Sequence, residues 1–427
     1  MAKKVVIVTY YWEPAGGPGV QRWLKFVKYL QHFDIEPIVF IPENPSYPMV
    51  DETFSDEIPK DITIVKQPIF EPYKFAEILS KKKSKTISKG IIANEKQSFV
   101  EKLMLYIRGN FFIPDARKFW VKPSVKFLKK YLKENNIDTV ITTGPPHSVH
   151  LIGLKLRKQM DIKWLADFRD PWTTIGYHDE LRLTKKSQQK HIKLESEVLQ
   201  TADQLVTTSF TTKEEFSVLT KQPIEVITNG YDVEKFPAAP MDEKFTLSHI
   251  GSLLSERNPL VLWEVLAELI QENADFAKDF QLQFAGVVSE RIQRDIREAG
   301  LEKHTTYFGY VSHQRALQLQ RASQLLVVIE IDAAKTKGII AGKLFEYMAA
   351  ERPIIGLGPK DADIAKIIQE TNTGTYFLYT EKEKLKTQVV AYYEAYKQQK
   401  LQVSAIGLQK YSRKALTKKL AEVLHSL

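Results

Sequence analysis

The most constraining feature of this sequence is an alternation of short apolar segments with amphipathic ones, which runs twice along the chain. The apolar segments of the first half are residues 3–11, 36–42, 139–148, 163–172, 202–209 and 223–232, and those of the second half are residues 244–254, 280–288, 305–311, 324–331 and 352–358. Nearly continuous apolar strands separated by helices are typical of parallel sheets covered on both faces. The alternation therefore predicts an α/β protein with two doubly wound parallel sheets.

The length of the chain agrees with two domains. A chain of 427 residues exceeds what one hydrophobic core normally holds. Residues 225–243 are rich in proline and polar side chains, and we place the boundary there, which gives domains 1–235 and 236–407. The last segment, 408–427, reads as an amphipathic helix because leucines recur every fourth residue.

Composition narrows the class of protein. The chain has no cysteine, so disulfides, thiolate metal sites and a cysteine nucleophile are excluded. Its 43% hydrophobic and 26% charged residues are typical of a soluble globular protein. The apolar stretch at the N-terminus is too short for a signal peptide, and no run approaches the roughly 20 apolar residues that span a bilayer. We expect a cytoplasmic protein.

Positive charge is concentrated in one region. Residues 74–133 hold 16 Lys/Arg against 4 Asp/Glu, within a chain of net charge +9. Such a region suits an anionic partner, although a simply solvated face is an equal alternative. Aromatic side chains interleave with the charge over residues 102–120, which favours an anionic membrane surface, at the inner face of the plasma membrane. Nucleic acid is disfavoured because no binding motif accompanies the charge.

Ligands of doubly wound sheets bind outside the carboxyl ends of the strands, so the loops after strands are the candidate sites. The first of these, "EPAGGPGVQRW", contains Gly16, Gly17 and Gly19 before a helix. Glycines permit close approach of the backbone, and the helix start offers amides to an anion. The loop lacks the lysine of a Walker A motif and the spacing of a dinucleotide fingerprint, so a plain tight turn is the alternative.

The second loop, "TTGPPHSVH", carries His147 beside Ser148. Ser148 can cap the following helix, on which His150 is expected. A histidine at a helix start is a candidate base or substrate contact, and a polar surface position is its alternative.

The third loop, "ADFRDPW", follows a strand with two acids around Arg169. Asp167, Arg169 and Asp170 are either ligand contacts or a self-contained ion pair. Trp172 supplies a flat apolar face of the kind on which sugars stack.

The fourth stretch, "GKLFEYMAAERPII", begins a helix at Gly342 with Lys343 and Glu346 on one side. The helix start and Lys343 suit a phosphate, and an acceptor carboxylate one turn on suits paired sugar hydroxyls. That order matches a nucleoside diphosphate laid along the helix start. The alternative is a salt bridge between Lys343 and Glu346.

These blocks together resemble the group-one retaining glycosyltransferases of the GT-B fold, over nearly the whole chain. The resemblance rests on "GGPG", "TTGPPHS", "ADFRDPW", "ITNGYD", "IGSLLSERNP", "FAGVV", "YFGYV" and above all "GKLFEYMAAERPII". It implies two facing Rossmann-like domains, with the acceptor bound by the first domain and a nucleotide sugar by the second. It also implies that the final helix crosses back to the first domain.

The resemblance assigns roles to single residues. It implies that Arg257, Lys343 and the helix start at Gly342 neutralise the departing diphosphate without a bound metal or other cofactor. Glu346 matches the glutamate that binds the donor ribose, and Gly286 lies among the loops that form the donor pocket. With these we place Gly16 and Gly17 as donor contacts, His147 and Asp170 as catalytic residues, and Arg169 and Trp172 as acceptor contacts.

The sequence departs from the family pattern at three positions. Gly338 stands where the first glutamate is usual, and Glu330 and Asp332 are substitutes without the expected spacing. Ser252 and Asn258 stand where an arginine and a lysine are usual. Arg257 and Lys343 would then hold the phosphates largely between them.

The function expected from this resemblance is transfer of a sugar, with retention, from a nucleoside-diphosphate sugar to a glycan or lipid-linked acceptor in the synthesis of cell-surface polysaccharide or glycolipid. A nucleotide-sugar epimerase of the same fold and a non-catalytic nucleotide-sugar-binding scaffold remain as alternatives.

Overall fold

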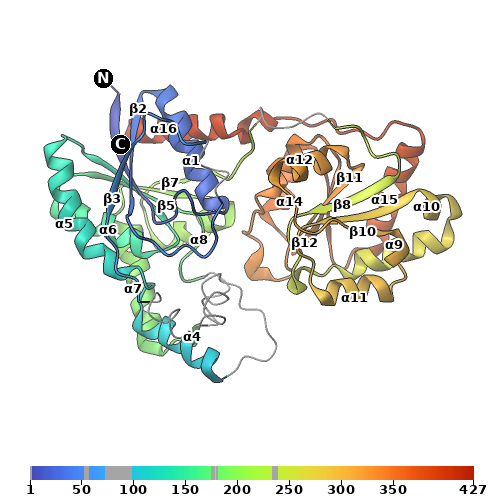
Figure 1. Ribbon diagram of the computed structural model, residues 1–427, viewed down its shortest axis with the longest axis horizontal. Helices are drawn as coiled ribbons and strands as arrows, with labels where there is room; N and C mark the ends of the chain where they lie inside the picture. The colour runs from blue at the N-terminus through green and yellow to red at the C-terminus, as the bar shows by residue number, and fades with distance from the viewer. Residues whose placement is uncertain (1, 52–56, 73–98, 175–177, 179–180, 233–238) are drawn as a thin grey trace. The chain divides into compact units, whose positions relative to one another are not determined.

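The computed structural model describes residues 2–51, 57–72, 99–174, 178, 181–232 and 239–427 (Figure 1). The chain forms two compact units, of which the first comprises Met1–Thr228 with Arg413–Leu427 and the second Asn229–Ser412. The boundary expected at residue 235 falls within 233–238, outside the described residues. Each unit is described by itself below.

The first unit is built on a seven-stranded parallel sheet, in the order β3-β2-β1-β4-β5-β6-β7. Its strands are β1 (Lys3–Val8), β2 (Ile35–Pro42), β3 (Thr63–Gln67), β4 (Thr139–Gly144), β5 (Lys163–Phe168), β6 (Gln204–Thr207) and β7 (Ile224–Val226). Its helices are α1 (Pro18–Leu30), α4 (Phe99–Phe111), α5 (Lys118–Glu134), α6 (Ser148–Gln159), α7 (Lys185–Thr201), α8 (Phe210–Leu219) and α16 (Arg413–Ser426).

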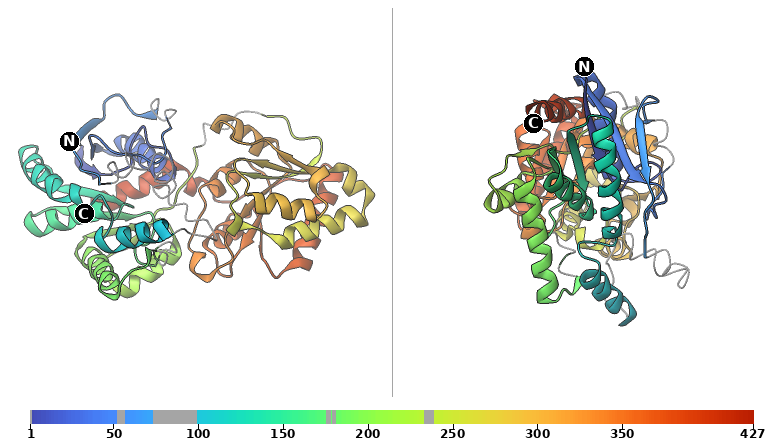
Figure 2. Two further views of the ribbon diagram at one scale, coloured as in Figure 1. Left: turned by 60° about the horizontal axis from the view of Figure 1, so that its bottom comes forward. Right: turned by 90° about the vertical axis from the view of Figure 1, so that its left-hand side faces the viewer.

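Both faces of this sheet are covered, as the continuous apolar strands predicted (Figures 1 and 2). Successive side chains of a strand point to opposite faces. In β1, Val5 and Ile7 pack in the cluster that holds the side chains of α1, whereas Val6 and Val8 pack in the cluster of α5 and α6. A strand buried on both sides needs an apolar residue at every position, which is why its sequence shows no alternation.

The last helix of the chain belongs to the first unit. Leu416, Leu420 and Leu424 of α16 are buried in the same cluster as Leu24 and Val27 of α1. Full burial of each leucine stabilises the packing by about 1.5–3 kcal/mol. The expected return of the final helix to the first domain is confirmed.

The second unit repeats the design with a six-stranded parallel sheet, in the order β10-β9-β8-β11-β12-β13. Its strands are β8 (Phe245–Ile250), β9 (Phe280–Ala285), β10 (Thr305–Tyr307), β11 (Leu325–Ile329), β12 (Ile354–Gly358) and β13 (Gly374–Leu378). Its helices are α9 (Leu260–Glu272), α10 (Ala274–Asp279), α11 (Glu290–Glu298), α12 (His313–Ala322), α13 (Lys343–Ala349), α14 (Asp363–Thr371) and α15 (Lys382–Lys397).

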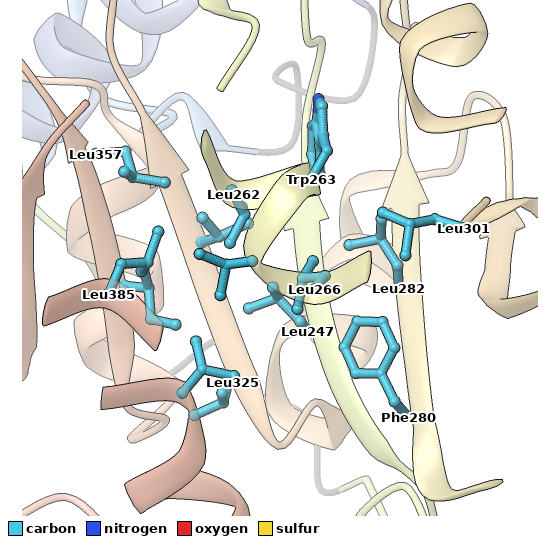
Figure 3. Packing of buried hydrophobic residues seen from close by; sticks show 14 of the residues in the cluster. Leu247, Leu262, Trp263, Leu266, Phe280, Leu282, Leu301, Leu325, Leu357 and Leu385 are labelled. Atoms are coloured by element: carbon cyan, nitrogen blue, oxygen red, sulfur yellow. The ribbon is translucent and has the colours of Figure 1, made fainter. Parts of the chain in front are cut away.

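The core of the second unit is formed where helices cover one face of this sheet. Leu262 and Leu266 of α9 lie over Leu247 of β8, and Leu282 of β9 and Leu385 of α15 extend the same cluster (Figure 3). All five side chains are at most 1% exposed. This packing fixes the strands whose carboxyl ends carry the candidate site.

The strand order of both sheets reverses direction once. The break lies between β1 and β4 in the first unit and between β8 and β11 in the second. At such a switch point the loops leaving two adjacent strands diverge and form a crevice, where ligands of doubly wound sheets bind. The predicted α/β architecture of two Rossmann-like units is thus confirmed. None of the helices in the described ranges has the length and hydropathy needed to cross a bilayer.

Candidate functional site

The switch point of the second unit gathers charged side chains from distant parts of the sequence. Lys343 is the first residue of α13, which follows the loop after β11. Its Nζ atom lies 2.9 Å from Nε2 of His249 in β8. The hydroxyl of Tyr347, one turn on in α13, accepts a hydrogen bond from the Ile250 amide at 2.7 Å and donates to the Ile250 carbonyl at 3.1 Å. These contacts fix the start of α13 against the end of β8.

Two glycines make this close approach possible. Gly251 follows β8 with φ of +123°, and a Cβ atom there would lie 2.7 Å from Nζ of Lys343. Gly286 follows β9 with φ of +114°, and its Cβ would lie 2.7 Å from the carbonyl carbon of Gly251. The positive φ disfavours a side chain at both positions, and at Gly286 the backbone of Gly251 also leaves no space for one. Gly286, expected at the donor pocket, packs against the strand end that carries the site.

A buried acid and a second cation complete the cluster. Glu330 directly follows β11 and is 1% exposed. Its Oε2 atom lies 3.3 Å from Nη2 of Arg257, which comes from the short 3-10 helix η5 (Ser255–Arg257) after β8. Burial raises the pKa of Glu330, and the charges of Arg257 and Lys343 act against that rise. Glu330 was noted in the sequence only as a substitute without the expected spacing, and the structure places it beside both predicted cations.

Electrostatics single out Lys343 among these groups. Burial, followed by the charge of Arg257, lowers the pKa of Lys343 to about 8, although the charges of Glu330 and Glu346 oppose this shift. Lys343 therefore carries its charge at neutral pH but holds its proton weakly. An anionic ligand beside Lys343 and Arg257 would favour the charged form of Lys343. The cluster has the sign and the position expected of an anion site.

Glu346 lies one turn beyond Lys343 but does not pair with it. Its Oε2 atom accepts a hydrogen bond of 2.9 Å from Nε2 of Gln320 in α12. Among the described residues no ion pair joins Lys343 and Glu346, so the alternative of a simple salt bridge at the helix entrance is not found. Gly342 precedes α13 with helical dihedrals and no side-chain cap, and a Cβ there would meet no atom within 4 Å.

Asn258 stands after β8, where the family usually has a lysine, and its contacts are structural. Asn258 accepts a hydrogen bond of 2.9 Å from the indole of Trp263 and donates one of 2.5 Å to Asp295. Its amide thus joins α9 to α11. Positive charge at the site comes from Arg257 and Lys343 instead.

The glycine-rich loop lies at the switch point of the first unit. Gly17 has φ of +113° and precedes α1, which has no side-chain cap. The Gly16 amide donates to the Met49 carbonyl at 3.0 Å, so this amide is used within the unit. A Cβ atom on Gly19 would lie 1.4 Å from Nη1 of Arg169. The third glycine is required because a guanidinium occupies the place of its side chain.

The loop after β5 is held by contacts with other parts of the first unit. Nε of Arg169 donates to the Gly144 carbonyl at 3.2 Å, and its Nη2 donates to the Pro145 carbonyl. Asp167 pairs with Arg22 of α1 at 3.0 Å, with both side chains buried. The alternative of an ion pair contained within this loop is therefore wrong for Asp167. Burial raises the pKa of Asp170, which Arg169 opposes.

Trp172 and His147 form a buried stack. Their rings are parallel within 4°, with centroids 5.0 Å apart, and Trp172 is 1% exposed. The indole also donates to Nδ1 of His191 at 3.0 Å. The expected free face of Trp172 for a sugar is wrong in this structure, because His147 covers one side and the core takes the rest. The sequence could not show this, since both residues lie in loops.

His147 itself is not a surface residue. It is 5% exposed, and burial lowers its pKa well below the usual value, followed by the effect of His150. The ring is therefore neutral at pH 7 and is a weak base. The expected cap of α6 is wrong: Ser148 lies inside the helix, and its amide and hydroxyl both donate to Asp115 at 2.8 Å.

Only part of the basic region lies among the described residues. Residues 74–98 of the basic region lie outside the described residues, and residues 99–133 include α4 and α5. Among the described residues, no three His, Cys, Asp or Glu side chains gather as a metal site would require. His249 was missed by the sequence analysis, and its one signal was a histidine within the strand segment 244–254.

Comparison with protein families agrees with this geometry. Residues 244–395 match the family model of glycosyl transferases group 1. The second unit is a group 1 glycosyltransferase domain. It contains Arg257, Glu330, Lys343 and Glu346, so the whole charged cluster belongs to the matched region. No curated protein sequence matches the chain.

Solved structures of glycosyltransferases share the fold over the full length. A glycosyltransferase from Rickettsia africae ESF-5 is 15% identical with a TM-score of 0.61, and covers 100% of this chain and 98% of its own. Anabaena HepE in complex with UDP is 13% identical with a TM-score of 0.65, and covers 100% of both chains. At such identities the likeness shows the fold, which is GT-B. The family match then identifies residues 244–395 as a glycosyltransferase domain within a chain of this fold.

Proposed function

We propose that this glycosyltransferase moves a sugar, with retention, from a nucleoside-diphosphate sugar to a glycan or lipid-linked acceptor in the synthesis of cell-surface polysaccharide or glycolipid. The observation that carries the proposal is the pair of cations, Arg257 and Lys343, held by Glu330 and His249 at the switch point of a group 1 glycosyltransferase domain.

The cations would act on the leaving group. As the bond between the sugar and the diphosphate breaks, negative charge grows on the diphosphate, and fixed cations in a buried site stabilise that charge best. Lys343 and Arg257 would supply this stabilisation, without a metal or other cofactor in the proposed step. Glu346, with acceptor oxygens only, would take the ribose hydroxyls. When the acceptor attacks the same face of the sugar from which the diphosphate departs, the configuration is retained without a protein nucleophile.

The first unit would hold the acceptor. His147 and Asp170 lie in the loops after β4 and β5, at the carboxyl edge of the sheet. Burial lowers the pKa of His147 and raises that of Asp170, so it favours the neutral form of both side chains. As a neutral ring, His147 would accept a hydrogen bond from an acceptor hydroxyl, and its lowered pKa makes it a weak base in that role. Arg169 lies beside the glycine-rich loop that contains Gly16 and Gly17.

A panel of donors tests this proposal. Purified protein is heated with UDP-, GDP-, ADP- and dTDP-sugars at equal concentrations, and the midpoint of unfolding is measured. Because stabilisation depends on ligand concentration relative to Kd, the preferred donor should give the largest shift. Uridine is our first expectation, since similar structures were determined with UDP and UDP-glucose. No shift with any nucleotide would overturn the proposal.

Epimerisation is the second candidate. A Listeria monocytogenes structure described as a UDP-N-acetylglucosamine 2-epimerase has a TM-score of 0.55 at 12% identity, and covers 100% of this chain and 96% of its own. An epimerase isomerises its sugar without an acceptor. Incubation of the preferred donor alone, followed by analysis of the sugar, separates the two: an isomerised sugar supports epimerisation, and an unchanged donor supports transfer.

We further propose an anionic membrane surface as a partner of the first unit. Leu103, Ile107 and Phe111 follow one another at every fourth residue of α4 and are 47%, 39% and 63% exposed, so one face of this helix is apolar and open. Lys102 on α4 and Lys122 and Lys126 on α5 are also exposed, and the stretch 99–133 is strongly basic. An exposed apolar helix face in a strongly basic stretch of the chain suits an anionic bilayer.

Vesicle sedimentation tests this surface. We expect the protein to sediment with phosphatidylglycerol vesicles at low salt, to stay in solution with phosphatidylcholine vesicles, and to be released by salt. Ile107→Glu should reduce binding, whereas Ile192→Glu, at a half-exposed position of α7, is the matched control. Equal binding of both variants and of the unmutated chain would exclude α4 as the contact.

A further inference from the structure

His249 is a fully buried polar group in the sheet of the second unit. It lies in β8, between Ser248 and Ile250, and is 1% exposed. Its Nδ1 atom lies 3.0 Å from the carbonyl oxygen of Val327 in β11. A carbonyl only accepts hydrogen bonds, so Nδ1 carries the hydrogen. The strand across the switch point therefore sets the orientation of the ring.

The other ring nitrogen faces the site. Burial lowers the pKa of His249 well below its usual value, followed by the charges of Lys343 and, more weakly, Arg257, while the carbonyls of Val327 and Ser252 act in the opposite direction. The ring is neutral, and its one hydrogen is on Nδ1. Nε2 then offers a lone pair to Nζ of Lys343, 2.9 Å away.

This contact restricts a side chain that is otherwise free to rotate. Lysine has a flexible stem of four carbons, and its ammonium adopts one position only when something selects it. Here the α-carbon of Gly251 leaves room for Nζ on one side, and His249 accepts its hydrogen bond. In the part of the chain that the structure describes, no other hydrogen-bond partner of Nζ is found.

We propose that His249 is a positioning residue for sugar transfer: its Nε2 atom holds the ammonium of Lys343, charged and in place, for the donor diphosphate. This rests on the proposed function, in which Lys343 contacts that diphosphate. Other charged groups also face Lys343, namely Arg257 from η5, Glu330 from the end of β11 and Glu346 from α13. His249 differs from these in being a neutral acceptor fixed by two strands.

Two substitutions separate positioning from packing. His249→Leu fills similar space without an acceptor, and His249→Gln retains an acceptor oxygen. The affinity for UDP is measured by calorimetry from pH 6.5 to 9.5, with unfolding midpoints as a check of folding. Loss of a hydrogen bond to a charged group should weaken UDP binding about tenfold in His249→Leu. Its alkaline loss of affinity should also begin at lower pH, because the ammonium has lost an acceptor. His249→Gln should restore both.

Reference variants make the outcomes distinct. If Lys343→Ala binds UDP as well as the unmutated chain does, the proposed donor site is wrong. If Lys343→Ala loses binding but His249→Leu keeps both affinity and pH profile, the donor site stands and the positioning role is overturned. If His249→Leu does not fold, His249→Met takes its place, since a flexible unbranched side chain adapts to tight cores.

The unmutated chain offers an independent spectroscopic check. Long-range ¹H–¹⁵N correlation spectra report which nitrogen of a neutral histidine carries the hydrogen, and the signal of His249 is assigned by its loss in His249→Gln. We expect a neutral ring protonated at Nδ1. A ring protonated at Nε2, or doubly protonated at pH 7, would overturn the proposal because Nε2 would have no lone pair for Lys343.

Discussion

The guanidinium of Arg169 lies directly over the α-carbon of Gly19, so that a Cβ atom on Gly19 would stand 1.4 Å from Nη1. The two residues are far apart in the sequence: Gly19 lies in the first turn of α1, and Arg169 directly follows β5. Arg169 also donates to the carbonyl of Gly144 after β4. One side chain thus joins the start of α1 to the carboxyl ends of β4 and β5.

We expect Gly19→Ala to displace Arg169 and destabilise the first unit. The methyl group must push the guanidinium from its carbonyl acceptors, and buried groups without partners cost about 1–3 kcal/mol each. The unfolding midpoint should fall by several degrees, which differential scanning calorimetry measures. Gly342→Ala is the control, because its added Cβ meets no atom and its dihedrals are helical. Equal midpoints for both variants would contradict the steric argument.

Removal of either cation should slow transfer strongly. Loss of one donor that stabilises developing negative charge typically lowers kcat by about 10²–10³. Lys343→Ala and Arg257→Ala should each show this loss in an assay of UDP release with the preferred donor and acceptor. Lys303→Ala, at an exposed position of the same unit, should be unaffected. Turnover within tenfold of the unmutated chain for both cation variants would refute the assignment.

Donor affinity should fall at alkaline pH. Lys343 has its pKa lowered to about 8, by burial first and then by Arg257. The ammonium is charged below this value and neutral above it, so binding of a diphosphate should be constant near pH 7 and weaken as pH rises through 8. Kd measured against pH gives the midpoint in the free enzyme. The fall in affinity at alkaline pH should vanish in Lys343→Arg, because arginine stays protonated throughout. An unchanged fall in affinity would assign the titration to another group.

The buried ion pair of the first unit should be costly to break. Asp167 accepts hydrogen bonds from Arg22 at 3.0 Å, from the indole of Trp23 at 2.9 Å and from the hydroxyl of Thr143 at 2.7 Å. Asp167→Asn leaves the Arg22 cation buried without its counter-charge, which typically costs 3–5 kcal/mol. Chemical denaturation measures this loss.

The matched control for that pair is an exposed acid. Asp161 follows the end of α6, and its fully exposed side chain lies 3.9 Å from Arg157 of that helix. Asp161→Asn should change the free energy of unfolding by no more than about 0.5 kcal/mol. A similar effect of both substitutions would show that burial does not determine the cost.

The sequence by itself determined the fold class. Apolar periodicity depends on local residues, and it predicted the parallel strands and the two-part design, whereas the return of the last helix was implied by the family resemblance. The motif that contains Gly342, Lys343 and Glu346 is also local, so it was found from the sequence. It pointed to the C-terminal domain that the family model matches.

Tertiary structure alone decided which side chains meet. Glu330 and Arg257 are 73 residues apart and His249 and Lys343 are 94, and no local pattern encodes these pairs. Trp172 looked accessible in a loop, but His147 and the core cover it. Side-chain partners are set by how strand ends align across a sheet, which depends on the packing of the whole unit and cannot be deduced from sequence spacing.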